Sequence, residues 1–185
     1  MRIVAGRWKG RVLKAPSSQD IRPTSDRLRE SLFNILAHGH DIEINGARVL
    51  DLFAGTGALG LEALSRGASF ALFVDEGAEA RALIRENTQT LGAAGITRLF
   101  RRDATRLGPV APFQPFTLVF ADPPYGKGLG EKAIASARDG GWLAPDALIV
   151  VEERGDAEVA APEGFEHIER REAGDSQIVF LRHRA

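Results

Sequence analysis

The sequence predicts an α/β fold with a mostly parallel central sheet that is covered by helices on both faces. Strand and helix patterns alternate from about residue 46 onward, and the expected strands are nearly continuous apolar runs, which is typical of strands buried on both sides. A glycine-rich turn joins the first of these strands to a helix. A chain of 185 residues suits one such domain with a modest extension.

The first residues predict a small β-hairpin ahead of the alternating pattern. Two short apolar runs, residues 2–5 and 11–14, flank the basic tip Gly6-Arg7-Trp8-Lys9-Gly10, whose glycines favour a tight turn. We expect a loop over residues 15–24.

The first predicted helix follows this loop. Residues 24–26, Thr-Ser-Asp, are good helix N-caps, and apolar residues recur at helical spacing over residues 26–37. We therefore expect a basic hairpin-and-helix extension over residues 1–40 and a main domain over residues 41–185.

The main domain is predicted to alternate strands and helices and to close with an antiparallel pair of strands. Strands are expected over residues 48–53, 69–74, 98–102, 116–121 and 147–152, the closing pair over 165–171 and 177–182, and helices over 59–66, 77–91 and 128–138.

The turn after the first strand has two interpretations. Gly55, Gly57 and Gly60 satisfy the G-x-G-x-x-G pattern between a strand and a helix, and Asp75 ends the second strand 20 residues after Gly55. This spacing is the fingerprint of a dinucleotide site, so an NAD-dependent oxidoreductase is one hypothesis.

Acidic residues near this turn favour S-adenosylmethionine (SAM) instead. Asp51 lies four residues before Gly55, where a carboxylate suits the ammonium and sulfonium of SAM and would repel a pyrophosphate. Asp75 could accept from ribose hydroxyls in either cofactor, and Asp103, expected at the end of the third strand, could accept from an adenine amine. The predicted cofactor site comprises Asp51, Phe53, Ala54, Gly55, Thr56, Gly57, Asp75, Asp103 and Ala104.

The most informative motif is Asp122-Pro123-Pro124-Tyr125, directly after the strand over residues 116–121. The prolines force the chain out of the sheet, which exposes a carboxylate, backbone carbonyls and an aromatic ring at the edge where open α/β sheets bind ligands. Such a group can hold a planar, amine-bearing substrate, so these four residues are the predicted catalytic site of a methyltransferase acting on nitrogen.

Charge is distributed unevenly along a chain whose net charge is −1. Residues 1–29 carry eight of the 24 basic residues and only two of the 25 acidic ones, Asp20 and Asp26. A basic arm on an acidic body predicts a polyanionic partner, and the phosphate contacts would come from the arm. The predicted RNA-binding residues are Arg7, Lys9, Arg11, Arg22, Arg27 and Arg29.

Composition excludes several other classes of protein. The chain has no cysteine, which rules out disulfides, thiolate zinc sites and a cysteine nucleophile. The four histidines show no ligand spacing, and the mechanism considered needs no metal. No apolar run approaches the length of a membrane span and no secretory signal precedes the first strand, so we expect a cytoplasmic protein.

These motifs together resemble the class I SAM-dependent methyltransferases, and more closely the bacterial 16S ribosomal RNA guanine-N2 methyltransferase family. The resemblance covers nearly the whole chain and is carried by the start over residues 2–11, the segment Arg22-Pro23-Thr24-Ser25-Asp26-Arg27-Leu28-Arg29-Glu30-Ser31-Leu32-Phe33-Asn34, the glycine-loop region Asp51–Gly67 and the motif Asp122–Tyr125. One departure is Ala173, where the family pattern has a tyrosine before Gly174.

The resemblance implies a Rossmann-like, seven-stranded sheet of order 3-2-1-4-5-7-6 with its last strand antiparallel. It implies methyl transfer from SAM to the exocyclic N2 of a guanine in 16S rRNA, with free rRNA or the assembling small subunit as partner, and we expect a monomer. Other acceptors stay open, namely an adenine N6 or a glutamine amide. A non-catalytic RNA-binding assembly protein and the NAD oxidoreductase are the hypotheses from other classes.

Overall fold

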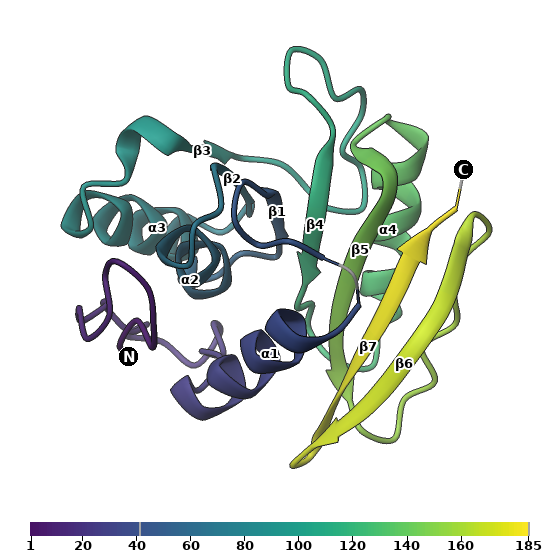
Figure 1. Ribbon diagram of the computed structural model, residues 1–185, viewed down its shortest axis with the longest axis horizontal. Coiled ribbons are helices and arrows are strands. Elements are labelled where there is room, and N and C mark those ends of the chain that lie inside the picture. The colour runs from purple at the N-terminus through teal and green to yellow at the C-terminus, as the bar shows by residue number, and fades with distance from the viewer. Residues whose placement is uncertain (41, 185) are drawn as a thin grey trace.

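The computed structural model describes residues 1–40 and 42–184, and it forms one seven-stranded sheet with helices on both faces (Figure 1). The elements in chain order are α1 (Asp26–His38), β1 (Arg48–Leu52), α2 (Ala58–Ser65), β2 (Phe70–Val74), α3 (Ala78–Thr90), a short 3-10 helix (Ala94–Ile96), β3 (Thr97–Phe100), β4 (Phe116–Ala121), α4 (Leu129–Asp139), β5 (Leu143–Arg154), β6 (Phe165–Ala173) and β7 (Ser176–His183). Residue 41, where the predicted main domain begins, lies outside the described residues.

The strand order is β3-β2-β1-β4-β5-β7-β6, as the resemblance implied. Strands β1 to β5 pair in parallel, β7 runs antiparallel to β5, and β6 runs antiparallel to β7. The order reverses between β1 and β4, and the carboxyl ends of these two strands therefore flank the crevice where an open α/β sheet binds its ligands. The predicted Rossmann-like fold class is confirmed.

Two hydrophobic clusters sandwich the sheet. One face of the sheet packs against α1, α2 and α3 through residues such as Phe33, Leu61 and Ile84, and the other packs against α4 through Ala133 and Ile134. Figure 1 shows α4 behind the sheet and the other helices in front of it. Both faces are covered, which explains why the parallel strands are almost uniformly apolar.

The N-terminal hairpin is smaller than predicted. Its expected strands are reduced to one antiparallel bridge between Arg2 and Val12. The backbone N–H groups of Val4 and Ala5 donate instead to the two carboxylate oxygens of Glu62 in α2, at 2.9 and 3.1 Å. Because these two donors are used by a helix side chain, the backbone pairing of the hairpin stops at Ile3, whose N–H donates to the Arg11 carbonyl at 2.9 Å.

The other boundaries agree with the sequence patterns to within two residues, except at β5, which begins four residues before the predicted start at 147. The N-terminal extension shares the core of the main domain, since Ile3, Leu13 and Phe33 belong to the same buried cluster as Val49 and Phe120. No helix among residues 1–40 and 42–184 is long and apolar enough to cross a membrane.

Candidate cofactor and acceptor site

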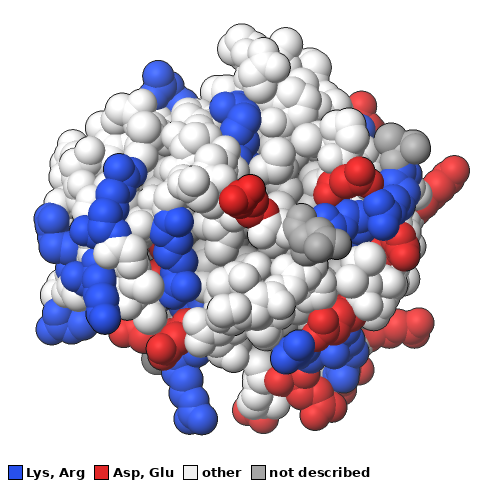
Figure 2. Space-filling model, in the orientation of Figure 1, with Lys and Arg blue, Asp and Glu red and all other residues white. Residues whose placement is uncertain are grey.

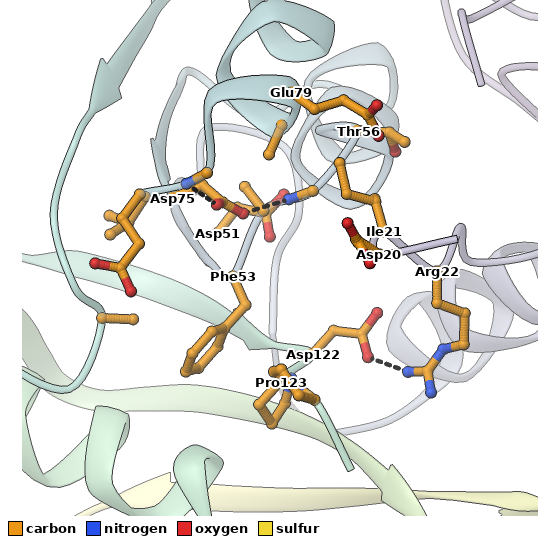
Figure 3. Close-up of a pocket in the computed structure, with 18 of the residues that line it drawn as sticks. Asp20, Ile21, Arg22, Asp51, Phe53, Thr56, Asp75, Glu79, Asp122 and Pro123 are labelled. Atoms are coloured by element: carbon orange, nitrogen blue, oxygen red, sulfur yellow. Dashed lines mark hydrogen bonds and ion pairs between the residues drawn. The ribbon is translucent and has the colours of Figure 1, made fainter. Parts of the chain in front are cut away.

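A cavity of about 700 Å³ lies at the carboxyl ends of β1, β2 and β4, beneath the loop of residues 15–24 (Figure 3). Cavities of about 300–1,000 Å³ commonly hold drug-sized ligands and cofactors. The cavity is lined by residues from the glycine loop, from the ends of the strands and from the Asp122 motif. The site therefore combines segments that are far apart in the sequence.

The glycine loop begins with an unusual backbone conformation at Phe53, whose φ is +55°. Bulky residues rarely adopt this left-handed region, and such outliers cluster at functional sites. Beyond it, the N–H of Gly55 donates to Asp75 Oδ2 at 3.0 Å, while Gly77 N–H donates to Asp75 Oδ1 at 2.9 Å. Asp75 thus holds together the loops that follow β1 and β2.

The third glycine of the motif, Gly60, allows α2 to lie close to the sheet. A Cβ at this position would come within 2.5 Å of the Phe73 ring on β2. The Gly60 N–H also donates to Asp51 Oδ2 at 3.0 Å. A glycine at position 60 is therefore required for the packing of α2, and this requirement is the same whichever cofactor is bound.

Asp51 is the most perturbed acid of the cofactor region. Burial raises its pKa to about 8, the Gly60 N–H opposes that shift, and the charge of Asp75 adds to it. No donor in the described part of the chain reaches its second oxygen, Oδ1, although the residue lines the cavity. A cationic ligand group placed there would favour the ionised carboxylate.

Asp103 lies farther from its strand than predicted. β3 ends at Phe100, and Asp103 lies in the following loop, where Oδ1 accepts from the Thr105 N–H at 2.9 Å and from the Thr105 hydroxyl at 2.7 Å. These hydrogen bonds lower the pKa of Asp103. Its carboxylate is thus held ionised at the rim of the cavity, beside Ala104.

Most of the predicted cofactor residues line this single cavity. They are Asp51, Phe53, Ala54, Gly55, Thr56, Asp75, Asp103 and Ala104. Gly57 is not among the lining residues; it is the N-cap of α2, with a φ of +80°.

Asp122 projects into the same cavity from the end of β4, and its side chain is only 12% exposed. Burial and the neighbouring charge of Glu152 raise its pKa well above the ordinary value, and the guanidinium of Arg22 opposes this rise. Arg22 Nη2 donates to Asp122 Oδ1 at 2.8 Å, and the Thr24 hydroxyl donates to Oδ2 at 3.3 Å (Figure 3). The loop before α1 therefore closes over the predicted catalytic carboxylate.

Pro123 and Pro124 also line the cavity, but Tyr125 is not among its lining residues. The Tyr125 hydroxyl donates to Glu152 Oε1 at 2.8 Å, which together with burial raises the pKa of the phenol. The Arg22 guanidinium carbon lies 3.7 Å from the centroid of the ring. The ring face predicted to stack on a base is thus covered by an arginine.

The predicted basic residues divide into four exposed side chains, one that points into the site and one that is buried. Arg7, Lys9, Arg11 and Arg27 are exposed. Figure 2 shows Lys and Arg side chains gathered over the region where the N-terminal segment and α3 lie in Figure 1. Arg22 points into the site instead, against Asp122.

The prediction for Arg29 is wrong. Its side chain is fully buried, Nε pairs with Glu62 Oε1 at 3.3 Å and Nη1 donates to the Thr24 carbonyl at 3.2 Å. The signal was present in the sequence, because Arg29 precedes the buried Leu32, Phe33 and Leu36 at helical spacing. Arg29 stabilises the N-terminal extension and cannot reach a phosphate.

The loop of residues 15–24 lines the site, although no sequence pattern indicated it. Ser18, Asp20 and Ile21 line the cavity, and the Ser18 hydroxyl donates to Glu79 on α3 at 2.8 Å. Glu152 was not predicted as a site residue either, although parallel pairing of the strands at 116–121 and 147–152 indicates that it lies near Asp122.

Comparison with known proteins shows the family of the chain. The family model described as "Conserved hypothetical protein 95" matches residues 1–182. The chain belongs to this family. The chain is 44% identical over 152 residues to ribosomal RNA small subunit methyltransferase D of Escherichia coli K12, and the aligned region covers 82% of the chain and 74% of the relative. The enzyme of the same name from Haemophilus influenzae is 36% identical over 176 residues, covering 94% and 89% of the two chains.

Solved structures of methyltransferases share the fold. The structure named as the putative methyltransferase yhhF of Escherichia coli superposes with a TM-score of 0.84 at 36% identity and covers 100% of this chain and 98% of that one. TrmN from Thermus thermophilus gives a TM-score of 0.67 at 25% identity, covering 85% and 48% of the two chains. The Rossmann-like methyltransferase fold of the chain is therefore clear.

Proposed function

We propose that the chain transfers the methyl group of SAM to the exocyclic N2 of a guanine in small-subunit ribosomal RNA. One observation carries this proposal, namely that the glycine loop with Asp51 and the catalytic motif with Asp122 open into the same cavity. The two proteins named methyltransferase D are described as acting on small-subunit ribosomal RNA, which supports the same class of substrate.

The chemistry of the cavity suits SAM. Asp51 offers a carboxylate oxygen, Oδ1, that no donor among residues 1–40 and 42–184 reaches, and Asp75 and Asp103 add two carboxylates. The backbone at Phe53 and Gly55 has positive φ values of 55° and 59°. This acidic lining fits a cofactor that carries an ammonium, a sulfonium and ribose hydroxyls, and it would repel the pyrophosphate of NAD. When bound, SAM would supply a methyl group on a positively charged sulfur: the bond from the base nitrogen to the methyl carbon would form as the sulfur–methyl bond breaks, S-adenosylhomocysteine would leave, and the nitrogen would lose one proton.

The acceptor amine needs activation because the lone pair of guanine N2 is delocalised into the ring. Asp122 and the Pro123 carbonyl would accept the two N2–H bonds, which turns the lone pair toward the methyl group and stabilises the positive charge that develops on nitrogen. Alignment of the two reactants contributes about 7–11 kcal/mol to the reduction of the barrier.

The target base must be unpaired or flipped, because a base within a duplex cannot enter such a pocket. Tyr125 would stack on the extruded base once Arg22 has moved, which contributes roughly 1–3 kcal/mol. The exposed side chains of Arg7, Lys9, Arg11 and Arg27 would contact phosphates, which position the RNA without reading its sequence. Specificity would then come from RNA shape or from a partly assembled ribosomal particle in the cytoplasm.

Transfer of a labelled methyl group tests the proposal. The protein is incubated with tritiated SAM and either 16S rRNA or undermethylated small subunits, and the nucleosides are separated after digestion. We expect label in N2-methylguanosine. Label in N6-methyladenosine would move the acceptor to adenine, and calorimetric binding of NAD in place of SAM would contradict the cofactor assignment.

The variant Asp122→Ala separates chemistry from cofactor binding. It removes the acceptor for the amine hydrogens while leaving Asp51 and the glycine loop in place. We expect methyl transfer to be lost and SAM affinity by calorimetry to stay near that of the wild type. A normal turnover rate in this variant would exclude the proposed mechanism.

A further inference from the structure

A second carboxylate, that of Glu152, lies beside Asp122 on the neighbouring strand. β4 and β5 are parallel, and their register pairs Ala121 with Val151. The next residues, Asp122 and Glu152, therefore lie at the same level and on the same face of the sheet. The Glu152 side chain is only 12% exposed. Two largely buried carboxylates thus share the acceptor edge, and the proposed mechanism uses only one of them.

The guanidinium of Arg22 lies between these two carboxylates. Its Nη2 is 2.8 Å from Asp122 Oδ1 and 3.6 Å from Glu152 Oε1. Its carbon is 3.7 Å from the centroid of the Tyr125 ring, whose hydroxyl donates to the same Glu152 oxygen at 2.8 Å. The space beside the two carboxylates is therefore filled by the Arg22 guanidinium, a planar group of N–H donors that stacks on the Tyr125 ring and faces both acids.

A guanidinium has the same connectivity as the N1–C2–N2 part of guanine. In both groups a planar carbon carries nitrogens whose hydrogens point outward in one plane. A guanine in the position of Arg22 would stack on Tyr125, donate N2–H to Asp122 and direct N1–H to Glu152. An adenine would present a bare N1 acceptor to Glu152, and two acceptors facing each other leave a buried group unpaired.

We propose that Glu152 is a specificity-determining residue that accepts the N1–H of the acceptor guanine. The Arg22 guanidinium marks the position that this base edge takes. The proposal rests on the proposed function, because it needs a guanine in the acceptor pocket. It goes further by stating which atom of the base is read and which side chain reads it.

The test uses two RNA substrates that differ only at the target nucleotide, which is guanosine in one and 2-aminopurine riboside in the other. 2-Aminopurine keeps the amine that receives the methyl group, but its N1 is a bare acceptor. We expect the wild type to favour guanosine in kcat/KM by about 10- to 100-fold, the effect of one hydrogen bond to a charged group. In Glu152→Gln the amide can donate to the bare N1, so the preference should fall at least about tenfold.

Glu153→Gln is the matched control. Glu153 is the adjacent buried acid, and its Oε1 accepts from the backbone N–H of Gly126 at 3.0 Å and of Arg154 at 2.8 Å. Its loss should change the rates on both substrates alike and leave their ratio at the wild-type value. A general loosening of this strand would therefore not imitate the expected result.

Three outcomes overturn the inference. Equal use of guanosine and 2-aminopurine by the wild type excludes a reading of N1–H, and this comparison needs no variant to fold. An unchanged ratio in a folded Glu152→Gln excludes Glu152 as the reader. If the wild type methylates no guanosine in either rRNA or particles, the proposed function itself has failed and the inference fails with it, a result distinct from the first two.

Discussion

Arg22 and Asp122 are 100 residues apart in the sequence, yet their side chains form an ion pair of 2.8 Å at the centre of the site. This contact joins the loop before α1 to the end of β4 and places a cation next to a largely buried acid. The pair links the N-terminal extension to the acceptor pocket, so changes in the extension should alter the chemistry at Asp122.

The ion pair predicts a shift in the pH dependence of activity. Burial and Glu152 raise the pKa of Asp122, and Arg22 lowers it. Arg22→Ala removes the lowering influence, so the pKa of Asp122 should rise. Since an ionised Asp122 is needed to accept from the amine, the acidic limb of the kcat/KM profile, which reports the free enzyme, should move to higher pH. The exposed Arg27→Ala is the control, and an unmoved limb in Arg22→Ala would contradict the coupling.

Asp51 should make the unliganded protein less stable as pH rises. Its pKa is near 8 in the folded protein and about 3.8 when unfolded. Between these values the folded state binds more protons than the unfolded state, so stability is greatest at the acid end and declines toward pH 8, by up to about 1.4 kcal/mol per pH unit.

Denaturant unfolding of Asp51→Asn between pH 5 and 8 measures this contribution. The variant should lose most of the decline and be more stable than the wild type near pH 8. Asp103→Asn is the control, because the pKa of Asp103 is lowered and its contribution is lost only below this window. A wild-type slope in Asp51→Asn would show that Asp51 does not retain a proton in the fold.

Arg29 and Arg27 should differ sharply although both belong to α1. Arg29→Ala leaves Glu62 buried with one fewer cation, which should lower the free energy of unfolding by about 3–5 kcal/mol. Arg27→Ala removes an exposed side chain and should leave stability almost unchanged. Thermal or denaturant unfolding measures both, and equal losses would be inconsistent with the buried pair.

The exposed basic side chains of the hairpin should control the salt dependence of RNA binding. Neutralising Arg7, Lys9 and Arg11 together would remove the three proposed phosphate contacts, so the slope of log K against log salt should become shallower by about 2–3. Filter binding at several salt concentrations measures this slope. Lys132→Ala, which removes an exposed cation on α4 across the sheet from the hairpin, serves as the control, and an unchanged slope in the triple variant would contradict a hairpin contact with RNA.

Much of the fold was predictable because local patterns carry it. Apolar runs mark the strands, glycines and prolines end them, and the parallel arrangement brings their carboxyl ends to one edge. For this reason Asp51 and Asp122 could be placed in the same crevice from sequence alone. The extent of the hairpin was not predictable in this way, since the N–H groups of Val4 and Ala5 donate to Glu62, a residue about 57 positions away.

The sequence by itself determined which residues lie at the ends of the parallel strands, among them the glycine loop and Asp122, the acid of the proposed catalytic motif. Only the tertiary structure decided which charges face one another: Arg29 toward Glu62, Arg22 toward Asp122, and Glu152 beside them. The physical reason is that strand and helix periodicity depends on neighbours along the chain. The pairing of long charged side chains depends on how loops and helices cross the sheet.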